Sequence, residues 1–136
     1  MATEQPIVVL GAEDKDWVLR VWKPAAKVLG VDAGTIWYRW VTYAPANEHW
    51  IGVREVAFAQ YRQRRDGVKV LYSIGVAPVA KRQGLGRRLI EHIGFPMELK
   101  TDADHAESNA FYRKLGFKFA GQKRGGAKVF NIYRWL

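Results

Sequence analysis

The N-terminal part of the chain predicts a strand followed by a helix. The apolar run Ile7 to Leu10 is stopped by Gly11 and is typical of a short strand buried on both faces. After Asp14, apolar residues recur at the spacing of one helix face, and Gly30 offers a stop. These residues are Val18, Val21, Trp22, Ala25, Val28 and Leu29. Pro24 is expected to kink this helix.

Residues 35–50 form an aromatic stretch that fits no single period, so no element is assigned to it. Its aromatic residues are Trp37, Tyr38, Trp40, Tyr43 and Trp50. Aromatic side chains dominate both cores and binding sites, and both interpretations stay open here.

The remainder of the chain alternates between strand and helix patterns. Strands are expected from about Trp50, with Glu55 on one of them, up to a hairpin turn at Asp66-Gly67, and then over 68–76. A helix should open at Gly84, and a strand should cover 97–101. A second helix over 106–115 ends at Gly116, and strands at 117–120 and 129–135 flank a Gly125-Gly126 turn.

This order indicates an α/β fold with a mixed, mostly antiparallel sheet of six to seven strands flanked by helices. A length of 136 residues predicts one domain over 1–136. The chain has no cysteine, which excludes disulfides, thiolate metal sites and a cysteine nucleophile. No run is apolar enough for a membrane crossing and no signal-peptide layout is seen, so a cytoplasmic location is expected.

The charge is lopsided, with 22 Lys and Arg against 13 Asp and Glu and a net charge of +9. Such a balance indicates an anionic partner, and nucleic acid and a polyphosphorylated cofactor both satisfy it. The alternative for most of the individual lysines and arginines is a basic surface that serves solubility. The basic hairpin from Arg62 to Lys69 favours an acidic or nucleic-acid-associated acceptor, or is simply a solvated turn. His49, His92 and His105 have no metal-ligand spacing, and no metal is expected.

The most informative segment passes from a strand at Ile74 to a helix at Arg87 through a basic loop that contains Gly84 and Gly86. The start of a helix leaves backbone N–H groups unpaired and carries the positive end of the helix dipole, so it can hold a phosphate. Lys81 and Arg82 add charge at the mouth of this loop, which suits a diphosphate. A plain strand-to-helix turn with a basic rim is the alternative.

This segment resembles the cofactor loop of the GNAT superfamily of N-acetyltransferases: Gln or Arg, two residues, Gly, one residue, then Gly or Ala. The run from Lys81 to Gly86 departs from it only in having Lys first, which keeps the charge but loses the planar fork of arginine. The strand before it looks like the family's fourth strand, which pairs with the pantetheine arm. The resemblance implies that acetyl-CoA contacts Ile74, Gly75, Val76, Lys81, Arg82, Gln83, Gly84, Leu85, Gly86 and Arg87.

A second, separate match runs from Ser108 to Phe117 and is similar to the family's motif around the far end of the cofactor. By this resemblance Tyr112 is the general acid that protonates the departing thiolate, and Asn109 contacts the cofactor arm. Core packing for Tyr112 and helix capping for Asn109 are the structural alternatives.

A carboxylate, or a water that it holds, has to take a proton from the acceptor amine. The candidates are Glu55, Glu98, Asp102 and Asp104, and Glu98 is preferred because it lies on the predicted fifth strand. A surface salt bridge is the alternative for each of them.

The resemblance implies an N-acetyltransferase that moves acetyl from acetyl-CoA to a primary amine by direct attack. A small amine, a protein amino group and a modified nucleobase all stay open as acceptors, and no oligomeric state is indicated. The other function considered is a non-catalytic CoA-binding or basic nucleic-acid-associated module on the same fold.

Overall fold

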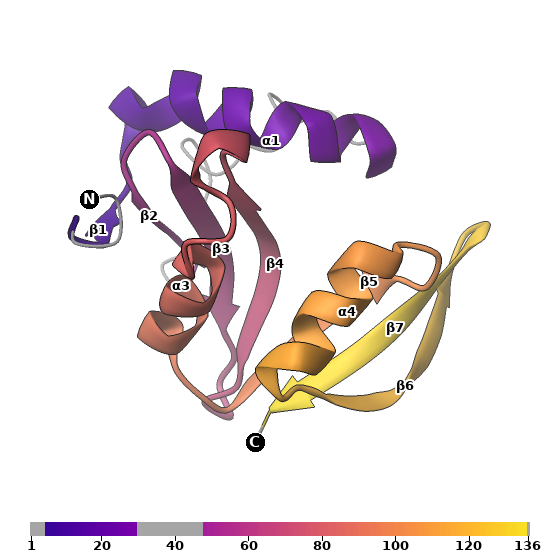
Figure 1. Cartoon of the computed structure of the whole chain (residues 1–136). Coiled ribbons are helices and arrows are strands. Elements are labelled where there is room, and N and C mark those ends of the chain that lie inside the picture. The colour runs from indigo at the N-terminus through magenta and orange to yellow at the C-terminus, as the bar shows by residue number, and fades with distance from the viewer. Residues whose placement is uncertain (1–4, 30–47, 136) are drawn as a thin grey trace.

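The computed structural model describes residues 5–29 and 48–135, and these form one twisted sheet with helices on both faces (Figure 1). The strand order in the sheet is β1-β2-β3-β4-β5-β7-β6. The strands are β1 Val8–Val9, β2 Glu48–Val53, β3 Ala57–Gln63, β4 Lys69–Val76, β5 Met97–Asp102, β6 Lys118–Gly125 and β7 Lys128–Trp135. Neighbouring strands are antiparallel, except that β4 and β5 are parallel. The predicted mixed, mostly antiparallel α/β sheet is therefore confirmed.

The helices divide between the two faces of the sheet. The helices are α1 Lys15–Leu29, α3 Leu85–Ile93 and α4 Ala106–Leu115, with short 3-10 turns η2 Ala12–Asp14 and η3 Pro78–Ala80. Helix α1 covers β2 to β4 on one face, where Trp22 packs against Trp50 and Phe58 with ring centroids 6.1 Å away in each case. Helices α3 and α4 cover the opposite face, called here the α3/α4 face, where Leu89 and Tyr112 belong to one core.

The crossover from β4 through α3 to β5 is the predicted helical connection between parallel strands. Helix α3 begins after Gly84, and α4 ends at Gly116, which adopts the left-handed conformation with φ 108°. The hairpin turns at Asp66-Gly67 and Gly125-Gly126 also lie where the sequence predicts them.

The first strand differs from its prediction. Among the described residues, strand β1 pairs only with β2 at the edge of the sheet, and the side chain of Val9 is 76% exposed. The prediction of burial on both faces is therefore wrong, because a short apolar run does not show whether the second face of a strand is covered.

The turn between β2 and β3 lacks the residues that announce a turn. It covers 54–56, and Glu55 adopts a positive φ of 72° there without being glycine. Glu55 thus lies in a turn and not on a strand, which corrects the prediction. Its carboxylate forms an ion pair with Arg20 of α1, 2.7 Å apart.

Helix α1 is anchored at its start by a buried carboxylate. Asp14, only 2% exposed, accepts hydrogen bonds from Trp17 Nε1 at 2.8 Å, Gly11 N at 3.0 Å and Arg54 Nε at 3.1 Å. Burial by itself raises the pKa of Asp14, but these three hydrogen bonds outweigh it and the pKa lies below its usual value. The helix then continues through Pro24 to Leu29, beyond which residues 30–47 lie outside the described part, including most of the aromatic stretch.

Candidate active site

Strands β4 and β5 part in the middle of the sheet. They pair only at Lys69–Met97, Val70–Glu98 and Leu71–Leu99, although β4 continues to Val76. The strands separate at a β-bulge: Gln60 of β3 pairs with Ser73 and Tyr61 with Leu71, so Tyr72 is an extra residue on β4. Beyond Leu71, one edge of β4 therefore has no ladder partner on β5, and Figure 1 shows the two strands diverging toward opposite halves of the molecule.

The predicted strand residues Ile74, Gly75 and Val76 lie on this unpaired segment of β4. Gly75 is required by packing on the α1 side, because a Cβ there would be 2.6 Å from Cε1 of Phe58. The side chain of Ile74 lies on the other face, with Cδ1 3.9 Å from the place where a Cβ of Gly86 would be. The start of α3 is thus packed directly against the end of β4.

The start of α3 offers unpaired N–H groups. Its first intrahelical hydrogen bond runs from Arg88 N to Gly84 O at 3.0 Å, and no side chain caps Gly84. The N–H groups of Leu85, Gly86 and Arg87 therefore precede the helical ladder. Gly84 adopts φ 75° and Arg82 φ 67°, a left-handed conformation that is uncommon for a residue with a side chain.

The loop side chains surround this helix start with positive charge. Lys81, Arg82 and Gln83 are exposed, Leu85 is anchored in the core, and Arg87 forms an ion pair with Glu91 on the same helix at 3.2 Å. Lys81 Nζ lies 3.8 Å from Glu107 Oε1 at the start of α4, on the other side of the parting strands. The predicted phosphate loop is thus assembled next to the unpaired edge of β4.

Tyr112 lies in the core of the α4 half. Its side chain is buried, with its ring centroid 5.1 Å from Phe111, 5.6 Å from Phe117 and 6.2 Å from Tyr133. Burial raises the pKa of Tyr112, so its hydroxyl keeps its proton at neutral pH. Within 5–29 and 48–135 the hydroxyl makes no hydrogen bond, so its proton is available to a ligand atom.

Asn109 uses its whole side-chain amide inside the protein. Its Nδ2 donates to Asp102 O at 3.0 Å and His105 O at 2.8 Å. Its Oδ1 accepts from Asn131 Nδ2 at 2.8 Å and from Tyr133 OH at 2.6 Å. Asn109 therefore fastens α4 to the end of β5 and to β7, and contact with a cofactor would require it to give up one of these bonds.

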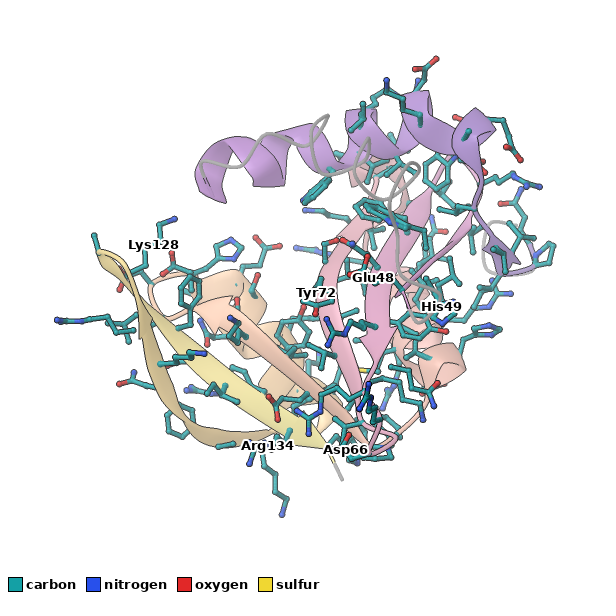
Figure 2. All side chains as sticks on the ribbon, turned by 180° about the vertical axis from the view of Figure 1, so that it is seen from behind. Glu48, His49, Asp66, Tyr72, Lys128 and Arg134 are labelled. Carbon is teal, nitrogen blue, oxygen red and sulfur yellow. The ribbon has the colours of Figure 1, made fainter. Side chains whose placement is uncertain are left out.

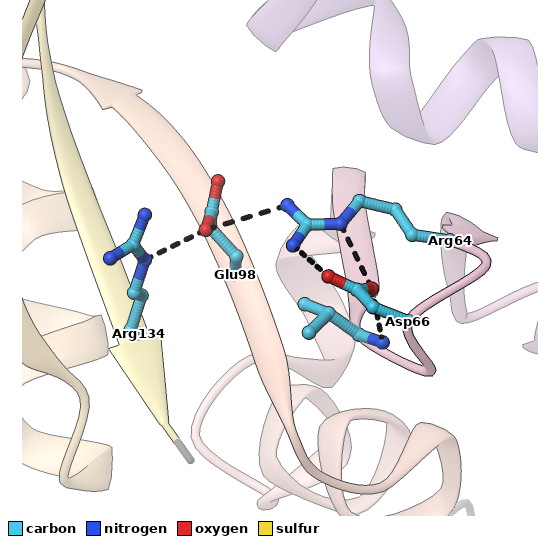
Figure 3. Close-up of polar contacts among 5 residues, drawn as sticks. Arg64, Asp66, Glu98 and Arg134 are labelled. Atoms are coloured by element: carbon cyan, nitrogen blue, oxygen red, sulfur yellow. Dashed lines mark hydrogen bonds and ion pairs between the residues drawn. The ribbon is translucent and has the colours of Figure 1, made fainter.

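Glu98 is held in an ion-pair network on the face opposite α3 and α4 (Figure 3). Its Oε2 accepts from Arg134 Nε at 2.7 Å and lies 3.7 Å from Arg64 NH1. Arg64 also holds Asp66, and hydrogen bonding from Arg64 lowers the pKa of Asp66 to about 2. The β3–β4 hairpin is thereby tied to β5 and β7 just below the point where the strands part.

The four predicted proton acceptors lie in different places relative to β5. Glu98 and Asp102 lie on the same face of β5, on either side of Lys100, since alternate residues of a strand share a face. Asp102 accepts from Asp104 N at 2.9 Å and lies 3.7 Å from Lys128 Nζ. Glu55 is in the β2–β3 turn, and Asp104 lies beyond the end of β5. Strand β5, which separates from β4 after Leu99, thus carries two of the four candidate proton acceptors.

Two features of this site give no signal in the sequence. The bulge at Tyr72 opens the sheet, yet the segment reads as an uninterrupted strand. The sequence shows Phe111 only as an apolar residue, whereas in the structure its ring packs so close to α3 that a Cβ on Gly86 would lie 3.0 Å from Cζ. In the described part, His, Asp and Glu form no group that could hold a metal ion, and no helix is long and apolar enough to cross a membrane.

Comparison with known proteins agrees with this geometry. The family model described as an acetyltransferase (GNAT) domain matches residues 45–119. The chain belongs to the GNAT family. As a member it is an acetyl-CoA-dependent N-acetyltransferase, and the family resemblance of its two motifs is confirmed.

One relative, the 5-NmdU N-acetyltransferase of Pseudomonas phage PaMx11, is 38% identical over an alignment of 103 residues that covers 68% of this chain and 74% of the relative. The ribosomal-protein-S18-alanine N-acetyltransferase from Escherichia coli is 22% identical, with a TM-score of 0.74 over 95% of this chain and 91% of that one. Arabidopsis thaliana NAA60 in complex with acetyl-CoA is 8% identical, with a TM-score of 0.74 over 96% and 97%. These two structures share the fold.

Proposed function

We propose that this enzyme transfers the acetyl group of acetyl-CoA to a primary amine carried by a nucleobase. The binding of acetyl-CoA is supported by one observation: the edge of β4 that is not paired with β5 lies beside the uncapped start of α3. The acceptor half is supported by the 38% identity to a 5-NmdU N-acetyltransferase and by the net charge of +9.

The phosphates of the cofactor bind at the start of α3. The N–H groups of Leu85, Gly86 and Arg87 hold a diphosphate, and Lys81 and Arg82 contribute charge at the mouth of the loop. The arm of the cofactor then runs along Ile74 to Val76, where backbone groups of β4 have no partner on β5. One such N–H polarises the thioester carbonyl.

The chemical step is direct attack. The amine loses a proton and attacks the thioester carbonyl carbon; a C–N bond forms and the C–S bond breaks. Tyr112 donates its proton to the departing sulfur and is reprotonated from solvent. Its raised pKa fits this role, because the phenol stays protonated until a strongly basic thiolate develops beside it.

Glu98 accepts the proton of the amine through a water molecule. It lies on β5 one residue before Leu99, the last residue that pairs with β4, on the face from which an acceptor can approach a cofactor that enters from the α3/α4 face. Comparison of Glu98→Gln with Asp102→Asn tests this role. The alkaline-shifted pH profile of kcat/KM expected on loss of a base should appear in Glu98→Gln only; the same shift in Asp102→Asn alone would assign the role to Asp102.

Thermal unfolding with and without acetyl-CoA tests the cofactor site. At about a hundredfold excess over Kd, binding adds roughly 2.7 kcal/mol, which raises Tm by several degrees. A variant with Lys81→Glu and Arg82→Glu should lose this shift. No shift in the wild type would overturn the cofactor assignment.

The acceptor is tested separately by the release of coenzyme A. A deoxyuridine that carries a primary amine on its base is compared with lysine and with an N-terminal alanine peptide as acceptors. Turnover with the nucleoside amine, or with the same base within an oligonucleotide, supports the proposal. Faster turnover with either of the other amines would contradict it.

A further inference from the structure

The face of β5, β6 and β7 opposite α3 and α4 is basic. Residues paired directly across an antiparallel ladder point to the same face, which places Glu98, Arg134 and Lys118 in one row. Alternate residues along β5 and β7 extend this row into a surface, and on β6 the register shift between Phe119 and Gly121 places Lys123, the partner of Phe130, on the same face as Lys118. Its cations, named here the basic face, are Lys100, Lys118, Lys123, Lys128 and Arg134. Figure 2 looks onto this face, with α4 behind the strands and Lys128 and Arg134 toward opposite ends of β7.

The carboxylates on this face are already matched by cations. Glu98 pairs with Arg134 and Arg64, and Asp102 lies 3.7 Å from Lys128. Lys100, Lys118 and Lys123 are exposed and form no ion pair with any residue of the described ranges. The face therefore carries surplus positive charge, which attracts an external anion.

An aromatic ring is placed among these cations. Lys100 Nζ lies 5.7 Å from the centroid of the Phe130 ring, and both side chains lie on the basic face. The cations are spread over three strands, about 4.8 Å apart, and do not converge on a pocket. An extended polyanion contacts such an array at many points, whereas a single small anion contacts one or two of its members.

The basic face also adjoins the reacting centre. Lys100 follows Leu99, the last residue of β5 that pairs with β4, so this cation lies where the two strands part. A backbone lying across this face would bring a base to the gap from the side opposite the cofactor.

We propose that the basic face binds the sugar-phosphate backbone of DNA and so presents the acceptor base to the gap between β4 and β5. This inference rests on the proposed function for the presented base, but binding itself is measured without acetyl-CoA. The occupant is DNA rather than an acidic protein, because the proposed acceptor amine is carried by a nucleobase, the relative that supports this acceptor is a 5-NmdU N-acetyltransferase, and the surplus charge is distributed over three strands.

The test measures anisotropy of a labelled DNA duplex and of its single strand over a series of salt concentrations. Lys118→Glu and Lys123→Glu are each compared with Lys15→Glu, which makes the same change of charge on an exposed residue at the start of α1. Each basic-face variant should weaken binding at least severalfold and reduce the slope of log K against log salt by about 1, while Lys15→Glu should change neither.

Three results would overturn the proposal: no DNA binding at low salt, an equal loss in Lys15→Glu, or tighter binding of polyglutamate or of an RNA of the same sequence. Acetyl-CoA thermal shifts are measured on the same variants. Retained shifts with lost DNA binding support the basic face, whereas a missing shift in the wild type rejects the cofactor site and leaves the DNA result to be judged separately. Turnover of the free nucleoside should be unchanged in Lys123→Glu while KM for amine-bearing DNA rises.

Discussion

Gly86 of α3 lies so close to Phe111 of α4 that a Cβ on Gly86 would be 3.0 Å from Cζ of the phenylalanine ring. This contact joins the two helices across the strands that part between them. The start of α3 is therefore packed against α4, and the predicted phosphate loop and Tyr112 belong to one packed unit.

Substitution of Gly86 by alanine should destabilise the protein. Alanine favours a helix over glycine by about 0.5–1 kcal/mol, but overpacking costs roughly 1–3 kcal/mol, so a net loss near 1 kcal/mol is expected. The same substitution in a Phe111→Leu background should cost less, because the ring edge is gone. Denaturant unfolding of the four proteins gives the coupling energy. Equal losses in both backgrounds would show that the ring does not limit the approach.

Tyr112→Phe should lower kcat by about 10²–10⁴-fold, with the KM for acetyl-CoA little changed. The hydroxyl bonds to no residue of the described ranges, so its removal should leave Tm nearly unchanged. Tyr133→Phe is the matched control, since it removes a buried hydroxyl that donates to Asn109 at 2.6 Å. That variant should lose stability and keep most of its kcat. Full activity in Tyr112→Phe would assign Tyr112 to packing alone.

Much of the fold follows from the sequence because the local signals agree with the tertiary structure. Gly84 and Gly116 mark helix ends, and Asp66-Gly67 marks a hairpin, since each position needs a positive φ or the start of a helix. The turn at Glu55 was not predictable in this way, because tertiary contacts impose a positive φ on a residue that does not favour it.

The site was predictable as a set of motifs but not as a geometry. The spacing of Gly84 and Gly86 predicts a phosphate loop, but the sequence does not show that Gly86 leaves room for Phe111. Asn109 was expected at the cofactor, yet two of its four hydrogen bonds come from Asn131 and Tyr133, which lie more than twenty positions later. Contacts between residues so far apart leave no periodic pattern in the sequence.

Asn109→Ala should cost about 2–4 kcal/mol of stability, because it leaves the donors of Asn131 and Tyr133 buried without their acceptor. In a Tyr133→Phe background the same change should cost less, since the Tyr133 hydroxyl is no longer there to be left without an acceptor. Chemical denaturation of the double-mutant cycle measures this difference. Additive losses would mean that water replaces Asn109 at these donors. The acetyl-CoA Kd of Asn109→Ala, measured well below its Tm, reports separately on cofactor contact.

Asp14 should give the protein an acid-sensitive component of stability. Burial raises the pKa of Asp14, but the hydrogen bonds from Trp17, Gly11 and Arg54 lower it by a larger amount, so the folded pKa lies below the unfolded value. The group therefore stabilises the fold above about pH 4, the ordinary aspartate pKa, and loses this contribution as pH falls through the folded pKa.

Asp14→Asn should cost about 2–4 kcal/mol near pH 7, since hydrogen bonds to a buried charge are worth roughly 1.5–3 kcal/mol each. The gap between the two proteins in urea unfolding should narrow below pH 4. Asp16→Asn, on the exposed first turn of α1, should change stability by less than about 1 kcal/mol at either pH. A gap that stays constant from pH 7 to pH 3 would show that the amide form is destabilising for reasons other than the lost charge.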